Sequence, residues 1–458
     1  MNALYKHSPE WVKDAMKYGY SLIPLNMRLG KRFYEQLNFL EKSQWWSTAE
    51  LENYQNEELK KLIRHAYDNV PHYNKVFKAN NIVPHDIKKI ADLIKLPLLK
   101  KDDVRNNIQA LRARNFKEKD IVMFSTSGTT GRPLHFYYEK KKDFPNFDPY
   151  VWRSFGWAGH TPHQRRATLS GWTTGKETIV YNPVWNMVIL SAYRMSSERI
   201  EEYAAGLRKY KVEYLDAYPS AAELLTSYLK TKDIRRPVNM RAIFCHSEYL
   251  YDWQRSAIED YWGCKCFNWY AMEERVISGM ECEAHEMLHL CSDYGITEFH
   301  STRSDGYGQI IATSLTNYAM PFIRYDTEDI GKPLDTPCRC GRGFPLFVLR
   351  GGRHRNFAIG KDGSQIPVTN IDIPNATKNV LQFQFIQEEI GALALSVIKK
   401  DDFGEEDLRA IRLKLDEKFG KNINTAIRFV DAIQQTNNRK TPIFIQNMKG
   451  SGGYGNAQ

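Results

Sequence analysis

Helix-like and strand-like segments alternate along most of this chain, and that alternation limits the folds open to it. From Glu57 to Val70 apolar residues recur at helical spacing, and Pro71 ends the run. Apolar runs of strand length lie at Ile121–Phe124, Ala242–Cys245, Cys266–Trp269 and Gln309–Thr313. The alternation continues to Arg350 and predicts a large α/β domain over residues 1–352.

The remainder of the chain has the pattern of a second, smaller domain. A polar, glycine-rich stretch over residues 351–356 is typical of a linker. Beyond it, Leu381–Gln387 and Ala392–Lys399 alternate like paired strands, and residues 408–419 have helical spacing. Ala426–Ile433 and Pro442–Gln446 have the pattern of a final pair of strands. We therefore predict an α+β domain over residues 353–448, followed by a disordered tail over residues 449–458.

Composition narrows the functional classes. Hydrophobic residues make up 42% of the chain and charged residues 26%, which excludes disorder as the dominant state. The 64 basic residues exceed the 54 acidic ones, giving a net charge of +10 that suits nucleic acid, a membrane surface or an anionic nucleotide. The basic residues are scattered, and the longest run is Lys140-Lys141-Lys142. No apolar run reaches membrane-helix length and no signal-peptide core is present, so we expect a cytoplasmic protein.

One loop carries the clearest chemical signal, Phe124-Ser125-Thr126-Ser127-Gly128-Thr129-Thr130-Gly131-Arg132-Pro133. Its glycines let successive backbone N–H groups converge on one point, its hydroxyls add further donors, and Arg132 adds a positive charge. These groups suit a nucleotide polyphosphate better than a merely polar hairpin turn. The loop is not a Walker A motif, and the alternating residues after it predict strand–loop–strand.

The loop resembles the phosphate-binding signature of the adenylate-forming superfamily of acyl-CoA synthetases and adenylation domains. Ser43-Gln-Trp-Trp and His65-Ala-Tyr-Asp-Asn-Val-Pro-His-Tyr73 resemble its phenylacetate–CoA ligase and CapK-like capsule-biosynthesis branch. The resemblance covers about residues 40 to 445. It implies a multi-sheet N-terminal α/β domain and a small mobile C-terminal lid.

The superfamily's Tyr-Gly-x-Ser/Thr-Glu motif, whose Glu helps hold Mg²⁺, has two candidates here. Tyr294-Gly295-Ile296-Thr297-Glu298 matches letter for letter, and Tyr270-Ala271-Met272-Glu273-Glu274 matches only at its ends. We favour the second, because it follows a predicted strand and precedes the acid–cysteine pair Glu281-Cys282. Ala271 and Glu273 depart from the motif.

Further segments resemble the remaining superfamily motifs. Cys245-His246-Ser247-Glu248 is similar to the turn that lines the adenine pocket, and Tyr218-Pro219-Ser220 to a turn beside the acyl pocket. Arg324-Tyr325-Asp326-Thr327-Glu328-Asp329 resembles the motif whose Asp binds the ribose hydroxyls, with Glu328 where glycine is usual.

The hinge and the C-terminal lysine complete the resemblance. Gly352-Arg353 matches the start of the hinge motif, with Arg355 at its usual acidic position, and Lys440 lies in a segment similar to the catalytic-lysine loop. The resemblance thus implies Lys440, Thr130 and Glu274 as catalytic residues. The residues it implies for ATP binding are Ser125, Thr126, Ser127, Gly128, Thr129, Thr130, Gly131, Arg132, Ser247, Glu248, Tyr270, Glu274, Asp329 and Arg353.

The seven cysteines all fall between Cys245 and Cys340 and favour a metal site over a disulfide framework. Cys338 and Cys340 lie one residue apart, and with Cys282 and a histidine they supply four soft zinc ligands. His285 and His289 are both candidates, and we prefer His289 because members of this branch carry the later histidine. The alternative is reduced cysteines in ordinary packing.

The resemblance implies ATP, Mg²⁺ and a carboxylic acid or amino acid as reactants, with an acyl-adenylate formed and pyrophosphate released. The acyl group would pass to the thiol of CoA or to an amine on a sugar of a cell-surface polysaccharide. Two alternatives stay open. One is a degenerate protein that binds ATP without activating acids, and the other is a basic nucleic-acid-binding protein.

Overall fold

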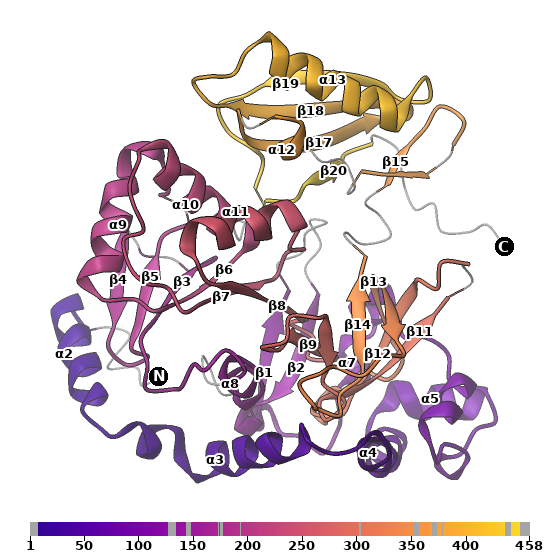
Figure 1. Cartoon of the computed structure of the whole chain (residues 1–458). Helices are drawn as coiled ribbons and strands as arrows, with labels where there is room; N and C mark the ends of the chain where they lie inside the picture. Colours follow the sequence, from indigo (N-terminus) through magenta and orange to yellow (C-terminus); the bar gives the residue numbers. More distant parts are fainter. Residues whose placement is uncertain are drawn as a thin grey trace.

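A computed structural model describes residues 8–126, 134–142, 148–172, 174, 177–192, 194–301, 304–350, 357–363, 365–368, 373–377, 379–435 and 441–448. The first hundred or so residues are mainly helical, and a large mixed sheet follows (Figure 1). The helices of this larger part are α2 (Glu10–Ser21), α3 (Leu25–Ser43), α4 (Thr48–Asn69), α5 (Pro71–Ala79), α6 (Lys101–Asn106), α7 (Ile108–Leu111), α8 (Pro149–Gly156), α9 (Ile200–Lys209), α10 (Pro219–Thr231) and α11 (Asp252–Trp262). Short 3₁₀ turns are η1 (Pro84–Asp86), η2 (Ile90–Lys95), η3 (Glu118–Asp120), η4 (Lys140–Lys142) and η5 (Ser197–Arg199).

The helix expected at Glu57–Val70 is the second half of α4. Ser47 caps its first turn, accepting a hydrogen bond from the Glu50 N–H while the Glu50 carboxylate accepts one from Ser47, so the helix starts well before its apolar stripe. Val70 ends α4, and Pro71 occupies the first turn of α5, where its missing N–H costs nothing. None of the described helices is long and apolar enough to cross a membrane.

A twelve-stranded sheet forms the framework, in the order β11-β12-β13-β14-β10-β9-β8-β7-β6-β3-β5-β4. Its strands are β3 (Arg166–Leu169), β4 (Ile179–Asn182), β5 (Met187–Leu190), β6 (Tyr214–Ala217), β7 (Ala242–His246), β8 (Lys265–Ala271), β9 (Ser278–Glu281), β10 (Leu288–Leu290), β11 (Gly295–His300), β12 (Gly308–Ser314), β13 (Tyr325–Leu334) and β14 (Leu346–Leu349). Strands β5, β3, β6, β7 and β8 are parallel, and β9 to β14 are antiparallel. The strands expected at 242–245, 266–269 and 309–313 are thus confirmed as β7, β8 and β12.

Helices cover both faces of the parallel half. In Figure 1, α9, α10 and α11 lie on one side of β3 to β7, with α3 and α8 toward the other. The first side buries Leu207, Leu225 and Trp262 against the sheet. The second buries Leu40 and Phe155, whose ring stacks on Phe244 of β7 at 3.9 Å between centroids. Because both faces are covered, the parallel strands are buried almost throughout, as their apolar sequences predict.

The segment around the glycine-rich loop is a hairpin apart from this sheet. Strands β1 (Ile121–Ser125) and β2 (His135–Glu139) pair antiparallel, with Ser125 opposite His135. The predicted strand–loop–strand arrangement is therefore confirmed. Phe136 is fully buried and contacts the ring of Phe322, which anchors the hairpin to the core shared by α4, α5 and the antiparallel half of the sheet.

The C-terminal part has a core of its own, in which Phe385, Leu395, Ile411 and Leu415 are buried. Its elements are β15 (Phe357–Ile359), β16 (Gln365–Pro367), α12 (Ile373–Ala376), β17 (Val380–Glu389), β18 (Ala392–Lys399), α13 (Glu405–Phe419), β19 (Asn424–Phe429) and β20 (Phe444–Gln446). The paired strands expected at 381–387 and 392–399 are confirmed as β17 and β18. The two final strands are confirmed as β19 and β20, but they do not pair with each other. The order is β19-β18-β17-β20, and each edge strand runs parallel to a different strand of the central hairpin.

Candidate functional site

Two hydrogen bonds join the first and last described residues of the glycine-rich loop where it leaves β1. The backbone N–H of Thr126 donates to the Leu134 carbonyl at 2.9 Å, and the Leu134 N–H donates to Thr126 Oγ1 at 3.0 Å. Ser125 is exposed at the end of the strand. Residues 127–133, which include the other predicted phosphate contacts, lie outside the described residues. The two bonds hold the ends of the loop together, as a tight anion-binding loop requires.

Two segments far apart in the sequence meet at the carboxyl end of β8. Tyr270, on β8, donates a 2.9 Å hydrogen bond from its hydroxyl to Oδ2 of Asp329 on β13. Tyr325, at the start of β13, donates one of 2.8 Å to Oε1 of Glu274. Each segment thus supplies one tyrosine and one carboxylate to the other. The structure thus joins two segments that the sequence analysis assigned to separate motifs, one with a candidate magnesium ligand and one with a candidate ribose ligand.

Glu328 occupies the position where the resembling motif has glycine, and its backbone has the conformation that glycine favours. Its φ is 65°, in the left-handed region, which costs a residue with a Cβ free energy. Its carboxylate forms a 3.0 Å ion pair with the Nζ of Lys101, at the start of α6, and both side chains are largely buried. The substitution therefore keeps the turn geometry, and the ion pair offsets part of the strain.

The rival segment around Tyr294 has a different structural role. Glu298 lies on β11 and accepts two hydrogen bonds from the guanidinium of Arg324, at 3.1 and 3.0 Å. His300 adds a contact of 3.1 Å. This bidentate ion pair between Glu298 and Arg324 holds β11 against the start of β13. Glu274, which lies beside Tyr325, remains our candidate for the magnesium ligand.

The turn after β7 joins three parts of the chain. Ser247 has a φ of 67° and is exposed, so the chain bends sharply there. The Glu248 carboxylate accepts a 3.0 Å hydrogen bond from the Ser220 N–H, at the start of α10, and one of 2.8 Å from the Thr441 N–H. Lys440 and Arg353 lie outside the described residues, but Thr441 is the residue next to Lys440. The C-terminal segment therefore begins against the predicted adenine turn.

Three cysteines and one histidine form a compact cluster of metal-ligating atoms. The ligand atoms of Cys282, His289, Cys338 and Cys340 all lie within 4.8 Å of one another. The sulfurs of Cys282 and Cys338 are 3.6 Å apart, and the Cys340 sulfur lies 3.4 Å from Nε2 of His289. In a tetrahedral zinc site with Zn–S bonds of about 2.3 Å, neighbouring ligand atoms are about 3.5–3.8 Å apart. The donor set and its spacing fit zinc.

The second shell of this cluster also fits a metal. His289 is fully buried, and its Nδ1 lies 3.3 Å from the Phe344 carbonyl, so donation to that oxygen directs Nε2 to the thiols. Burial lowers the pKa of His289 to about 4, which keeps the imidazole neutral and able to ligate. His285 is not in the cluster. Its ring lies 4.4 Å from that of Phe267, and its Nδ1 is 3.8 Å from Oε2 of Glu281.

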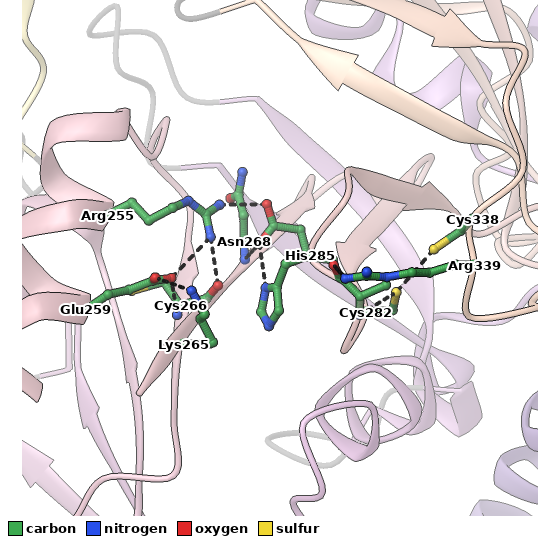
Figure 2. Close-up of polar contacts among 11 residues, drawn as sticks. Arg255, Glu259, Lys265, Cys266, Asn268, Cys282, His285, Cys338 and Arg339 are labelled. Carbon is green, nitrogen blue, oxygen red and sulfur yellow. Dashed lines mark hydrogen bonds and ion pairs between the residues drawn. The ribbon is translucent and has the colours of Figure 1, made fainter. Parts of the chain in front are cut away.

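A partly buried ion-pair network that no sequence pattern indicated connects the cluster to β8 (Figure 2). The Arg255 guanidinium, from α11, donates to Oε1 of Glu281 at 2.6 Å and to the Cys266 carbonyl at 2.8 Å. The Asn268 N–H donates to Oε2 of Glu281 at 3.0 Å. Burial alone would raise the pKa of Glu281, but the contacts with His285, Arg255 and Asn268 hold it below its usual value. The acid next to Cys282 therefore fixes the strand that carries Tyr270. An arginine at helical spacing gives no sequence signal for this role.

Comparisons with known proteins find relatives over most of the chain. A family model described as the CapK C-terminal domain matches residues 359–447. Protein CapK of Staphylococcus aureus is 24% identical over 464 residues, covering 98% of this chain and 100% of that protein. The phenylacetate-coenzyme A ligase of Aromatoleum evansii is 29% identical over 327 residues, or 67% of this chain and 73% of that protein. That of Escherichia coli strain K12 is 27% identical over 326 residues, covering 67% and 74%.

Solved structures share the fold. A crystal structure of 2-hydroxyisobutyryl-CoA ligase in the postadenylation state, in complex with 2-HIB-AMP, has a TM-score of 0.72 at 16% identity. The matched region covers 88% of this chain and 91% of the 2-hydroxyisobutyryl-CoA ligase chain. The large mixed α/β sheet and the small α+β unit thus have the architecture of acyl-CoA ligases.

Proposed function

We propose that this chain, a homologue of CapK and of the phenylacetate-coenzyme A ligases with the adenylate-forming fold, is an AMP-forming ligase. It activates a carboxylic acid with ATP, releases pyrophosphate, and passes the acyl group to a second nucleophile. The observation that carries the proposal is the double contact at the carboxyl end of β8, Tyr270 with Asp329 and Tyr325 with Glu274. These two contacts support a nucleotide site in which Asp329 would bind the ribose and Glu274 would hold the magnesium ion.

Each group has a chemical task in this proposal. An ionised Asp329 accepts hydrogen bonds from the two ribose hydroxyls. Glu274 holds the Mg²⁺ that neutralises phosphate charge, and the loop Ser125–Arg132 surrounds the phosphates, with Thr130 among its donors. Lys440 bridges the substrate carboxylate and the α-phosphate as charge develops. Both reactants are anions, so in-line attack needs this concentration of positive charge and donors.

The second half-reaction follows a rotation of the small domain about the Arg353–Arg355 linker. The acceptor is the thiol of CoA or an amine on a sugar used in a cell-surface polysaccharide. The similarity to phenylacetate-coenzyme A ligases supports the first acceptor, and that to CapK over nearly the whole chain supports a role in capsule synthesis.

We also propose that Cys282, His289, Cys338 and Cys340 hold a structural zinc ion. Four protein ligands leave no open coordination position, so the ion contributes to folding and takes no part in acyl transfer. It would fix the turn at Cys338–Cys340 against β10 and, through Glu281, the strand that carries Tyr270.

Acid-dependent exchange of labelled pyrophosphate into ATP tests the ligase proposal. We expect exchange with at least one acid from a panel of aromatic, fatty, hydroxy and amino acids, and its loss by about a hundredfold in Lys440→Ala. Lys230→Ala, a substitution at the end of α10, is the matched control and should leave the rate unchanged. ATP binding without exchange for any acid would instead indicate the degenerate alternative.

A further inference from the structure

A polar cluster lies where the winding of the parallel sheet reverses. From β3 the chain moves outward to β5, and it then returns through α9 to β6 on the other side of β3 before continuing to β7 and β8 (Figure 1). The reversal falls between β3 and β6. In open α/β sheets, ligands bind outside the carboxyl ends of the strands at such a point.

The carboxyl ends of these strands carry hydrogen-bonding side chains that are buried or nearly so. Asp216 of β6 lies opposite Thr168 of β3, and its Oδ1 accepts a 3.1 Å hydrogen bond from the Thr168 hydroxyl. The same oxygen is 2.9 Å from Nε2 of His246, the last residue of β7. Ser170 extends the chain of hydroxyls, with its Oγ 3.0 Å from that of Thr168. Three parallel strands thus contribute to one hydrogen-bonded cluster.

The carboxylate of Asp216 is ionised and already balanced by positive charge. Burial alone would raise its pKa, but the hydrogen bond and charge of His246, together with Arg166, hold it below the usual value. The Nε of Arg166 is 3.4 Å from Oδ2. A second cation here would face Arg166 and would be repelled.

Aromatic rings frame the cluster. The ring of His246 lies 5.7 Å from that of Tyr218 and 5.5 Å from that of Trp269, on β8. The indole N–H of Trp269 is buried and has no hydrogen-bond partner among the described residues. Ionised and polar groups of this kind cost free energy in a core, where apolar residues would pack as well. A ligand group that both donates and accepts hydrogen bonds could form hydrogen bonds with these polar groups.

The cluster is continuous with the proposed active site. His246 is followed by Ser247, whose hydroxyl is 2.9 Å from Nδ1 of His246, and then by Glu248, which contacts Ser220 and Thr441. The next strand, β8, carries Tyr270 next to its last residue. A substrate held at the cluster would therefore lie beside the turn that we assign to the nucleotide.

We infer that the acid which this ligase activates carries a hydroxyl group, recognised by Asp216 and His246 with the hydroxyls of Thr168 and Ser170. The inference rests on the proposed function. A hydroxyl is neutral, donates to the carboxylate and accepts from a nearby N–H, whereas an ammonium group adds charge beside Arg166 and cannot accept. A plain alkyl or phenyl group would form no hydrogen bond with this cluster or with the buried indole N–H of Trp269.

Pyrophosphate exchange with matched acids tests this inference on the full chain. The sets are lactate, propionate and alanine; mandelate, phenylacetate and phenylglycine; and gluconate and hexanoate. We expect at least one hydroxylated acid to exceed its deoxy and amino partners by about a hundredfold or more. His246→Phe and Thr168→Val should each bring that ratio to within about tenfold, mainly by slowing the hydroxylated acid. His163→Phe, at an exposed histidine, is the matched control and should keep the ratio.

Each other outcome has a definite meaning. A deoxy or amino acid that exchanges as well as its hydroxylated partner overturns the inference and leaves the ligase assignment standing. An unchanged ratio in both variants removes the cluster from substrate recognition and also overturns it. Thr168→Val is nearly isosteric, and ATP binding by both variants verifies their fold. Absence of exchange with every acid overturns the proposed function itself.

Discussion

The hydroxyl of Tyr325 donates a 2.8 Å hydrogen bond to Oε1 of Glu274, and both side chains are buried. Tyr325 begins β13, and Glu274 lies in the segment that follows β8; these strands are not neighbours in the sheet, since β9, β10 and β14 separate them. The contact therefore fixes the segment after β8 against the antiparallel half of the sheet. It makes the position of Glu274, our candidate magnesium ligand, dependent on a residue about fifty positions away.

Tyr325→Phe tests that dependence. Removing the hydroxyl takes a donor from a buried carboxylate, so we expect the free energy of unfolding to fall by about 1–3 kcal/mol. The Mg²⁺ concentration for half-maximal pyrophosphate exchange should also change several-fold. In the control, Tyr261→Phe, the lost hydroxyl bonds to the Ile234 carbonyl and the Mg²⁺ dependence should not change. The same Mg²⁺ dependence in Tyr325→Phe as in the parent chain would separate Glu274 from magnesium.

The left-handed backbone at Glu328 predicts an unusual order of stabilities. Glu328→Gly and Glu328→Ala both lose the ion pair with Lys101, but only glycine relieves the strained φ of 65°. We expect the glycine variant to be more stable than the alanine variant by about 1 kcal/mol in denaturant unfolding. At Glu213, an exposed residue without a positive φ, the glycine variant should be no more stable than the alanine variant. Equal stability of the two Glu328 variants would contradict the assigned backbone strain.

The cysteine–histidine cluster predicts one zinc ion per chain. Elemental analysis of the purified protein should find it, and Cys338→Ser and His289→Gln should lose it and melt at a lower temperature, because a structural zinc stabilises only the folded chain. Cys264→Ser and His285→Gln are the matched controls and should retain the metal. A parent protein that binds no zinc, or a His285→Gln variant that loses it, would refute the ligand set.

Glu223 predicts a pH-dependent stability. Burial in α10 raises its pKa from 4.5 to about 7, and the hydrogen bond from Ser227 and the charges of Lys400 and Lys230 only partly oppose this. Since the folded state holds the proton more tightly, this residue's contribution to stability is full below about pH 4.5 and is lost as the pH rises toward 7. Glu223→Gln should therefore gain stability over the parent chain by up to about 3 kcal/mol between pH 4.5 and 7.

Urea unfolding of both proteins at several pH values measures this difference. The control is Glu201→Gln, at an exposed position of α9, whose stability relative to the parent should stay constant. A difference that does not grow with pH would show that Glu223 is ionised throughout. Lys400 follows β18, so the same titration reports on contact between α10 and the small domain.

The local sequence was sufficient to predict many of the helices and strands and several motif positions. Helical spacing located the second half of α4 and most of α13, and alternation located β17 and β18, because periodicity records which side of an element is buried. The hairpin around the glycine-rich loop was predictable for the same reason, since β1 and β2 are adjacent in sequence and paired in space. The spacing of Cys338 and Cys340 also indicated a metal turn without any tertiary information.

Only the tertiary structure decided which distant residues meet. The sequence offered Glu274 and Glu298, and His285 and His289, as alternative candidates, and only the resemblance favoured Glu274 and His289. The sheet order turns Glu298 toward Arg324 and places His289 among the cysteines. Lys101 of α6 reaches Glu328 of β13, and Asp216 of β6 reaches His246 of the neighbouring β7, and no local pattern specifies either contact. Periodicity encodes the burial of each element along its own axis, whereas partners across elements depend on the order and direction in which strands join the sheet.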